Sequence, residues 1–426
     1  MNKRFANLFG LNEEESIALL NTPIEQLAED DSRYVAASQL ANFPSDRSIA
    51  ALIAAVQNTD ESLNNRITRR KAVESLGKLQ ASQALQTIRT CLGEEDCYLV
   101  ENSVWAIGEI GTQDPEILEE ITLLLTKPGQ LYRVILQTLA KLNYQPATDR
   151  IRAFVEAEDP STASAAMSAI CQLAQDFSLI EQVVELLFHP KVFVRRLTIQ
   201  DLVDARYDAA IPQIARCPVS LAFRLRGIRL LAEDNGKPRA TVTFAQIQSD
   251  LEDVLRDRPD TLELVHRYEG IPPLADLIHE LYETDFGRCY LATQTILEHY
   301  PQEAPAALLE TYEAEAHNDY GAHYHVMKLM GWLKHAPAYE LLLEALHNKE
   351  PQFQKSRAAA ALALGELGDA RATSDLKACL ETKIWDLKYA ALMALEQLGD
   401  PSGREIAAND ADWLVQAKAR SLGITQ

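Results

Sequence analysis

A segment of eleven residues occurs twice near the C-terminus of this chain, and this repetition constrains the fold more than any other feature. Ala359–Asp369 reads AAALALGELGD, and Ala390–Asp400 reads AALMALEQLGD, 31 residues later. Near the N-terminus, Ala72–Leu79 matches Ser103–Ile110 at the same spacing of 31 residues. A fixed period of this kind is typical of solenoid proteins, in which each unit buries its apolar face only by stacking on its neighbours.

One apolar residue stands at the centre of each copy, and we call it the key position. Key positions lie 29 to 36 residues apart within two series, and the residue three before each is usually apolar too. Both residues then lie on one helix face, which neighbouring repeats share. The Gly-Asp pair after Leu367 and Leu398 predicts a helix end, a turn and a second helix. The key positions are Leu40, Leu76, Ile107, Leu139, Ile170, Leu202, Leu231, Leu297, Met330, Leu364 and Leu395.

The pattern predicts an all-α fold, a curved, right-handed α-solenoid of short HEAT-like helical repeats. The period breaks once, over residues 232–285, where Gly and Pro gather at Gly236, Pro238 and Pro259. We expect an N-terminal array at 1–231, an irregular joint at 232–285 and a C-terminal array at 286–426. The alternative is a single degenerate repeat with a long loop.

The composition narrows the class of protein. Formal net charge is −21, from 62 acidic and 41 basic residues, so binding to phosphate backbones is disfavoured and no nucleic-acid partner is expected. No apolar run reaches the roughly 18 residues of a membrane helix, and the N-terminus lacks the apolar stretch of a signal peptide. The six cysteines lie far apart without a C-x-x-C pair, which is typical of reduced thiols. We expect a soluble, cytoplasmic protein without a membrane span.

Charged side chains recur on what should be the inner surface of the solenoid. Such proteins usually bind ligands along their concave side. The residue six positions before each key residue does not lie on the buried helix face. In the N-terminal repeats this residue is mostly a charged one. This set is Arg70, Glu101, Arg133 and Arg196, and Trp105 lies four residues after Glu101 on the same face. We expect a ladder of charge with one aromatic step; a merely solvated face is the alternative.

A second cluster lies at residues 317–325, which read HNDYGAHYH, with Trp332 two turns later. Three of the nine histidines, two tyrosines and an aspartate fall in this segment. At the start of a helix they offer acids and bases that work near neutral pH. A helix cap by Asn318 or Asp319, with aromatic rings packed between repeats, explains the cluster equally well. The candidate catalytic residues are His317, Asp319, Tyr320, His323 and Tyr324.

Familiar catalytic motifs are missing from the sequence. His323 and His325 are two residues apart, so they point different ways on a helix, and no H-E-x-x-H motif occurs; we expect no metal site. The sequence also lacks a Gly-rich phosphate loop and a G-x-S-x-G motif. The residues alone therefore indicate no known enzyme class.

Two repeat segments, however, resemble a known family. Tyr98–Gly111 and Trp385–Asp400 resemble the repeat of the cyanobacterial E/F-type bilin lyases, HEAT-like proteins that attach linear tetrapyrroles to phycobiliproteins. The opening, Lys3–Phe9 and Asp30–Ala37, resembles the single-chain phycoerythrobilin lyases of the CpeY type and the lyase-isomerases of the MpeZ/MpeQ type. The resemblance spans essentially the whole chain.

This resemblance implies a reaction and its partners. The chain would hold a free bilin and attach phycoerythrobilin through a thioether to a cysteine of a phycoerythrin α subunit, for phycobilisome biogenesis. The bilin is the substrate, and no other cofactor is implied. One alternative is a lyase-isomerase that attaches the bilin as phycourobilin. Others are a non-catalytic chaperone or phycobilisome adaptor, and a general scaffold for protein assembly.

A bilin substrate gives the candidate residues chemical roles, which follow from its groups and not from the family. Two propionates call for arginines, because a guanidinium grips a carboxylate with two hydrogen bonds. The ring nitrogens of a protonated bilin call for a carboxylate, and a pyrrole ring stacks on indole. The bilin-binding candidates are Arg70, Arg133 and Arg196 for propionates, Glu101 or Asp319 for the nitrogens, and Trp105 and Trp332. The proton donors are Tyr320, Tyr324, His317 or His323.

Overall fold

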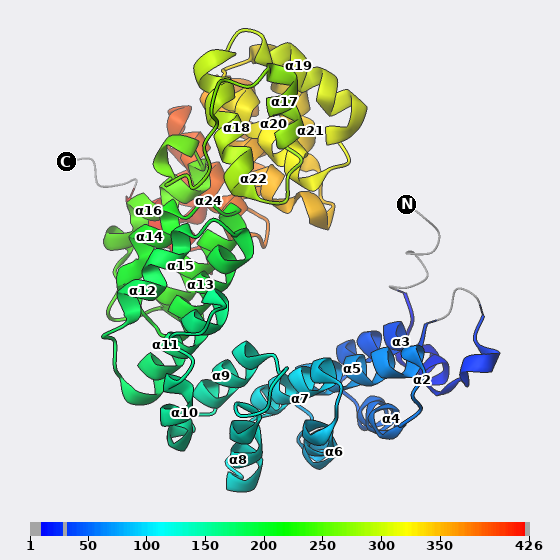
Figure 1. Cartoon of the computed structure of the whole chain (residues 1–426). Coiled ribbons are helices and arrows are strands. Elements are labelled where there is room, and N and C mark those ends of the chain that lie inside the picture. The colour runs from blue at the N-terminus through cyan, green and yellow to red at the C-terminus, as the bar shows by residue number, and fades with distance from the viewer. Residues whose placement is uncertain (1–9, 29–31, 422–426) are drawn as a thin grey trace. The chain divides into compact units, whose positions relative to one another are not determined.

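The computed structural model describes residues 10–28 and 32–421, and these are helical almost throughout (Figure 1). In the described residues the strands are two short pieces, β1 (Glu233–Asp234) and β2 (Lys237–Pro238), which pair in an antiparallel hairpin. The prediction of an all-α fold is confirmed. Lys3–Phe9 and Asp30–Asp31, which contributed to the family resemblance, lie outside the described residues.

The chain divides into two compact units, residues 1–180 and 181–426. The sequence divided the chain differently, into an array at 1–231, a joint at 232–285 and an array at 286–426. The repeats over residues 181–231 belong with the second unit for a physical reason. Arg195 and Arg224, both fully buried in these repeats, pair with Asp285 and Asp257 of the irregular segment. Periodicity alone gives no sign of such a bond.

The first unit is a stack of helix pairs, coloured blue to teal in Figure 1. Helices α3, α5, α7, α9 and α11 contact one another in succession, and α4, α6, α8 and α10 each pack on the partner that follows. The bounds are α2 (Glu13–Asn21), α3 (Arg33–Gln39), α4 (Asp46–Gln57), α5 (Leu63–Lys78), α6 (Leu85–Thr90), α7 (Cys97–Ile110), α8 (Pro115–Leu124), α9 (Tyr132–Lys141), α10 (Thr148–Arg152) and α11 (Pro160–Ala174).

The second unit continues the pattern and adds helices from the irregular segment. Helices α18, α20, α22 and α24 contact in succession, while α16 packs on α14 and α15 and also on α22 and α26. The bounds are α12 (Ile180–Glu185), α13 (Val192–Asp204), α14 (Ile211–Arg216), α15 (Leu221–Ala232), α16 (Phe244–Arg256), α17 (Leu274–Glu280), α18 (Phe286–His299), α19 (Ala304–Thr311), α20 (Tyr320–Trp332), α21 (Tyr339–His347), α22 (Gln354–Leu367), α23 (Thr373–Cys379), α24 (Trp385–Gln397), α25 (Ser402–Ala407) and α26 (Trp413–Ser421). In the described residues no helix is long and apolar enough to cross a membrane.

The key positions form the seam of both stacks, with one error of register. Ten of the eleven are at most 1% exposed, as the repeat pattern predicts. Leu297 is only half-buried, and its neighbour Ile296, at 0% exposure, occupies the seam. Because Ile296 and Leu297 are adjacent and both aliphatic, the repeat spacing could not tell which of them lies in the seam.

A glycine directly after the key position lets neighbouring helices approach closely. A Cβ on Gly331 would lie 2.7 Å from the Cα of Ala363, and a Cβ on Gly77 would lie 2.9 Å from the Cα of Ala106. Backbone on the facing helix cannot move aside as a flexible side chain does. The tight stacking of short repeats therefore depends on these glycines.

We expect Gly331→Ala to destabilise the second unit by about 1–3 kcal/mol, the usual cost of overpacking a tight core. Urea unfolding followed by circular dichroism measures the effect. Gly270→Ala is the control, because a Cβ there meets no atom within 4 Å. Equal unfolding midpoints for the two variants would contradict the close-approach account.

Candidate functional site

The cluster at residues 317–325 forms the start of α20. Asp319 caps the helix: its Oδ1 accepts the backbone N–H groups of Gly321 and Ala322, both at 2.8 Å. The helix cap that was expected at Asn318 or Asp319 is thus confirmed for Asp319. The cap uses only one of the two carboxylate oxygens of Asp319. Tyr320 is 50% exposed, and His317 is exposed with its Nδ1 3.0 Å from the carbonyl oxygen of Tyr312. Asp319, Tyr320 and His317 therefore lie where a ligand can reach them.

Tyr324, a candidate proton donor, lies in the interior. Its side chain is 1% exposed, and its hydroxyl donates to Asp257 Oδ2 at 2.5 Å. The reason is that the chain after α16 covers this face of α20, an arrangement that no repeat period encodes. Burial, together with the Asp257 carboxylate, raises the pKa of Tyr324 well above its ordinary value.

Two histidines of α20 are also buried. His323 is 1% exposed, and its ring centroid lies 4.6 Å from that of Phe353 and 5.5 Å from that of Tyr312. Burial lowers the pKa of His323 to about 4, so the imidazole is neutral at pH 7. His325 is 0% exposed, and neither ring nitrogen has a hydrogen-bond partner in the described residues. A neutral imidazole can accept a proton but has none to donate as an imidazolium.

Asp257 is the centre of a buried network beneath α20. It is 0% exposed and has left-handed backbone, φ 51°, directly after α16. Its Oδ2 accepts Lys328 Nζ at 2.6 Å and Tyr290 Oη at 3.0 Å, and its Oδ1 pairs with Arg224. One carboxylate thus faces two buried cations, so the network carries net positive charge.

The charges of this network set the pKa values of its members. Burial alone would raise the pKa of Asp257, but Lys328 and Arg224 outweigh it and hold that pKa below the ordinary value. Burial lowers the pKa of Lys328 to about 8, although Asp257 opposes the shift. The carboxylate therefore stays ionised and the ammonium stays mostly protonated at pH 7.

Lys355, in the first turn of α22, lies over three aromatic rings of the site. Its Nζ is 4.2 Å from the ring centroid of Phe286, 4.7 Å from that of Tyr320 and 5.0 Å from that of Tyr324. The side chain is half-buried. Burial lowers the pKa of Lys355 to about 7, and the nearby Lys328 contributes.

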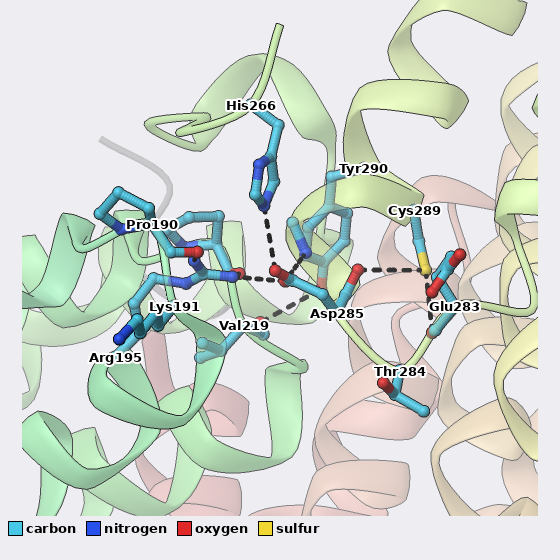
Figure 2. A network of polar contacts seen from close by, with 12 residues as sticks. Pro190, Lys191, Arg195, Val219, His266, Glu283, Thr284, Asp285, Cys289 and Tyr290 are labelled. Atoms are coloured by element: carbon cyan, nitrogen blue, oxygen red, sulfur yellow. Dashed lines mark hydrogen bonds and ion pairs between the residues drawn. The ribbon is translucent and has the colours of Figure 1, made fainter.

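A second network holds α18, which supplies Phe286 and Tyr290 to the site (Figure 2). Asp285 caps α18 by accepting the N–H of Gly287 at 2.9 Å. The same carboxylate pairs with Arg195 of α13 and lies 3.0 Å from His266 Nε2, and Figure 2 shows these side chains converging on it. A Cβ at Gly287 would lie 3.0 Å from Arg195 Nη2. The network fixes α18 against α13 and so positions the aromatic side chains beneath Lys355.

Trp332 lies at the far end of α20 and already has cationic neighbours. Its ring centroid is 4.9 Å from Lys328 Nζ and 5.3 Å from the guanidinium carbon of Arg258. The indole is half-buried. Arg196 contacts a different part of the second unit: its Nη2 donates to the carbonyl oxygen of Thr284 at 2.7 Å, and it lies over the Phe223 ring.

The remaining candidates lie in the first unit, on the consecutive helices α5, α7 and α9. Arg70 forms two hydrogen bonds with Asp96, at 2.9 and 2.7 Å, so its guanidinium already holds a carboxylate. Arg133 Nη1 donates to the carbonyl oxygen of Ser161 at 2.5 Å. Glu101 is half-buried, and burial raises its pKa. Trp105 is half-buried and packs against the core of this unit.

Several residues of the site were missed by the sequence analysis. Asp257 lies in the segment where the period breaks, so no phase could place it. Lys328, by contrast, follows Tyr324 by four residues, and this spacing puts both on one helix face. Lys355 is separated from the cluster by a full repeat, and only the stacking of α20 on α22 brings it close. In the described residues no group of three or more His, Cys, Asp or Glu side chains could hold a metal ion.

Comparison with known proteins gives the same repeat type along the chain. A family model described as PBS lyase HEAT-like repeat matches residues 32–58 and 68–94, and a HEAT repeats model matches residues 339–423. In the solved structure of the CpcE–CpcF complex of phycocyanin lyase from Nostoc, one chain is similar with a TM-score of 0.50 at 25% identity. The match covers 57% of this chain and 95% of that one.

Two full-length relatives are similar along their whole sequences. Phycocyanin operon protein Y of Pseudanabaena tenuis is 60% identical, over 99% of this chain and 100% of its own. Bilin biosynthesis protein CpeY of Synechococcus is 33% identical, over 94% of this chain and 99% of its own. Phycocyanobilin lyase subunit alpha of Picosynechococcus is 27% identical over 52% of this chain and 87% of its own. The chain therefore belongs to the family of HEAT-repeat bilin biosynthesis proteins that includes CpeY and the E/F-type lyase subunits.

Proposed function

We propose that this chain is a bilin lyase that attaches phycoerythrobilin through a thioether to a cysteine of a phycoerythrin α subunit. The observation that carries the proposal is the 33% identity to bilin biosynthesis protein CpeY along nearly the full length of both chains. The partners are the free bilin, which is the substrate, and the apo α subunit. We expect the reaction in the cytoplasm and with no further cofactor.

The reaction is an addition without redox change. The thiol S–H of the acceptor cysteine adds across the ethylidene double bond of the bilin. The sulfur bonds to one carbon, a proton ends on the other, and no group departs. The lyase orients the two partners and moves the proton.

The sulfur comes from the acceptor subunit in this proposal. Five of the six cysteines of this chain are buried, and burial raises the pKa of each of these thiols. For Cys217 and Cys289 the pKa is about 12. A thiol is nucleophilic only as its thiolate, so these groups are inert at neutral pH.

The solvent-facing part of the α20 cluster is our proposed reaction site. Asp319 faces the protonated ring nitrogens with its uncommitted oxygen, and the exposed Tyr320 hydroxyl delivers the proton, with His317 as a second carrier. His323 is buried, and its pKa of about 4 makes it a weak base that is neutral at pH 7, so we assign it no proton transfer. Tyr324, bonded to Asp257, holds the network in place. In the same unit, Arg196 is the proposed propionate contact and Trp332 the proposed stacking residue. The binding residues predicted in the first unit, Arg70, Glu101, Trp105 and Arg133, stay predictions from the sequence.

Coexpression tests this proposal. The chain is produced in a bacterial host together with enzymes that make phycoerythrobilin and with an apo α subunit of phycoerythrin. We expect a covalently bound, fluorescent α subunit under denaturing conditions, and none when the chain is left out or when the β subunit replaces α. An equal adduct without the chain would refute lyase activity. A phycourobilin absorbance spectrum on the product would establish the lyase-isomerase alternative instead.

A further inference from the structure

Lys355 occupies a cage of aromatic rings at the edge of the proposed reaction site. Its ammonium lies within 4.2 to 5.0 Å of the ring centroids of Phe286, Tyr320 and Tyr324. Rings at this distance attract a cation through their negative faces and hold it in one place. Tyr320 is 50% exposed, so one wall of the cage is open to a ligand.

No carboxylate in the described residues forms an ion pair with Lys355. Asp257, a buried carboxylate whose charge acts on Lys355, is already bonded to Arg224 and Lys328. Asp319 forms no ion pair with Lys355, and its Oδ1 accepts two backbone N–H groups. His325 is 0% exposed, and its ring centroid lies 4.8 Å from that of Phe286. In the described residues neither of its ring nitrogens has a hydrogen-bond partner. A half-buried cation that forms no ion pair in the described residues is free to bind an anion.

We propose that Lys355 binds a propionate carboxylate of the linear tetrapyrrole and thereby positions the chromophore over Tyr320. This inference rests on the proposed function and adds a specific anchoring residue to it. The two kinds of group in the cage match the two parts of such a ligand. The ammonium suits the carboxylate, and the exposed face of Tyr320 suits a planar pyrrole ring.

The titration of Lys355 makes the binding depend on pH. The groups that face it are Lys328, His323, His325 and Asp319 of the α20 region, Asp257 after α16 and Cys289 of α18. With a pKa of about 7 in the free chain, Lys355 is charged below pH 7 and increasingly neutral above it. A bound carboxylate stabilises the charged form, so binding takes up protons near pH 7.5. Bilin affinity should fall between pH 6 and pH 9.

The test compares free bilin with its dimethyl ester, which lacks both propionate charges, in absorbance titrations of the full chain. We expect the wild type to prefer the free acid, and Lys355→Met to weaken binding of the acid about tenfold, a usual effect of losing one charge-assisted contact. Binding of the ester should stay unchanged. Lys355→Arg keeps the charge and should retain most of the preference.

The control is Lys349→Met, which removes an exposed lysine from the loop just before α22. It should bind both compounds as the wild type does, and circular dichroism should show equal helicity for all variants. A Lys355→Met variant that keeps the full preference for the acid would overturn this inference and leave the proposed function standing. A wild type that binds neither compound would overturn both.

Discussion

We expect Asp319→Asn to lower the rate of chromophore attachment about 100-fold or more, in the range that general acid–base groups contribute, while α20 keeps its start. Asparagine caps helices as well as aspartate does, so this change removes the charge and keeps the cap. Tyr320→Phe should lower the rate by a similar factor, because it removes the hydroxyl that is the proposed proton donor. The half-exposed ring itself is kept, so the fold should not change. The measurement is the initial rate of covalent adduct formation with purified chain, bilin and apo subunit.

Matched variants separate this chemical role from a structural one. Asp114→Asn changes another helix cap, that of α8, and should leave the attachment rate unchanged. Asp319→Ala removes both charge and cap, and circular dichroism then reports how much helicity the cap supports. Full activity in both Asp319→Asn and Tyr320→Phe would remove these two residues from the mechanism.

The second large effect is on stability. We expect Asp257→Asn to destabilise the second unit by about 3–5 kcal/mol, because breaking a buried ion pair leaves a charge uncompensated. Here two cations, Arg224 and Lys328, would lose their partner in an interior where Asp257 is 0% exposed. Urea unfolding followed by circular dichroism should show an earlier transition for this unit.

A neighbouring aspartate provides the control for that measurement. Asp260 has a side chain that is 70% exposed and lies 3.8 Å from Arg258, so Asp260→Asn should change stability by roughly 0–1 kcal/mol. If Asp257→Asn unfolded at the same urea concentration as Asp260→Asn, the buried network around Asp257 would not stabilise the second unit.

The Asp257 effect also has a defined pH dependence. The pKa of Asp257 in the folded chain lies below its ordinary value of 3.8. Its stabilisation is therefore fully present above that value and is lost as pH falls through the lower, folded pKa. The contribution of the Asp257 carboxylate to stability should be fully present at neutral pH and shrink in acid below about pH 4.

Much of the fold follows from local pattern, and much of the site does not. The seam residues were predictable because each repeat buries the same helix face, and Leu297 was misplaced only because Ile296 precedes it. The cap at Asp319 was predictable from residue type. Asp257 and Lys355 were not, because they meet Tyr324 only through an irregular segment and through stacking of separate repeats.

The burial of Tyr324 could not be predicted for the same physical reason. A repeat phase describes the faces of a bare helix stack, and residues after α16 cover one of those faces in the second unit. Buried arginines also form ion pairs with residues far away in the sequence: Arg224 pairs with Asp257, and Arg195 pairs with Asp285. Such pairing leaves no periodic signal.

The central claim is that this chain catalyses bilin attachment, and purified components test it most directly. Bilin and apo α subunit of phycoerythrin are mixed with and without the chain, and the products are mapped by proteolysis and mass spectrometry. We predict that the chain directs one bilin to one cysteine, much faster than the spontaneous reaction and with the mass of a simple addition. The same rate and the same mixture of products without the chain would contradict the claim.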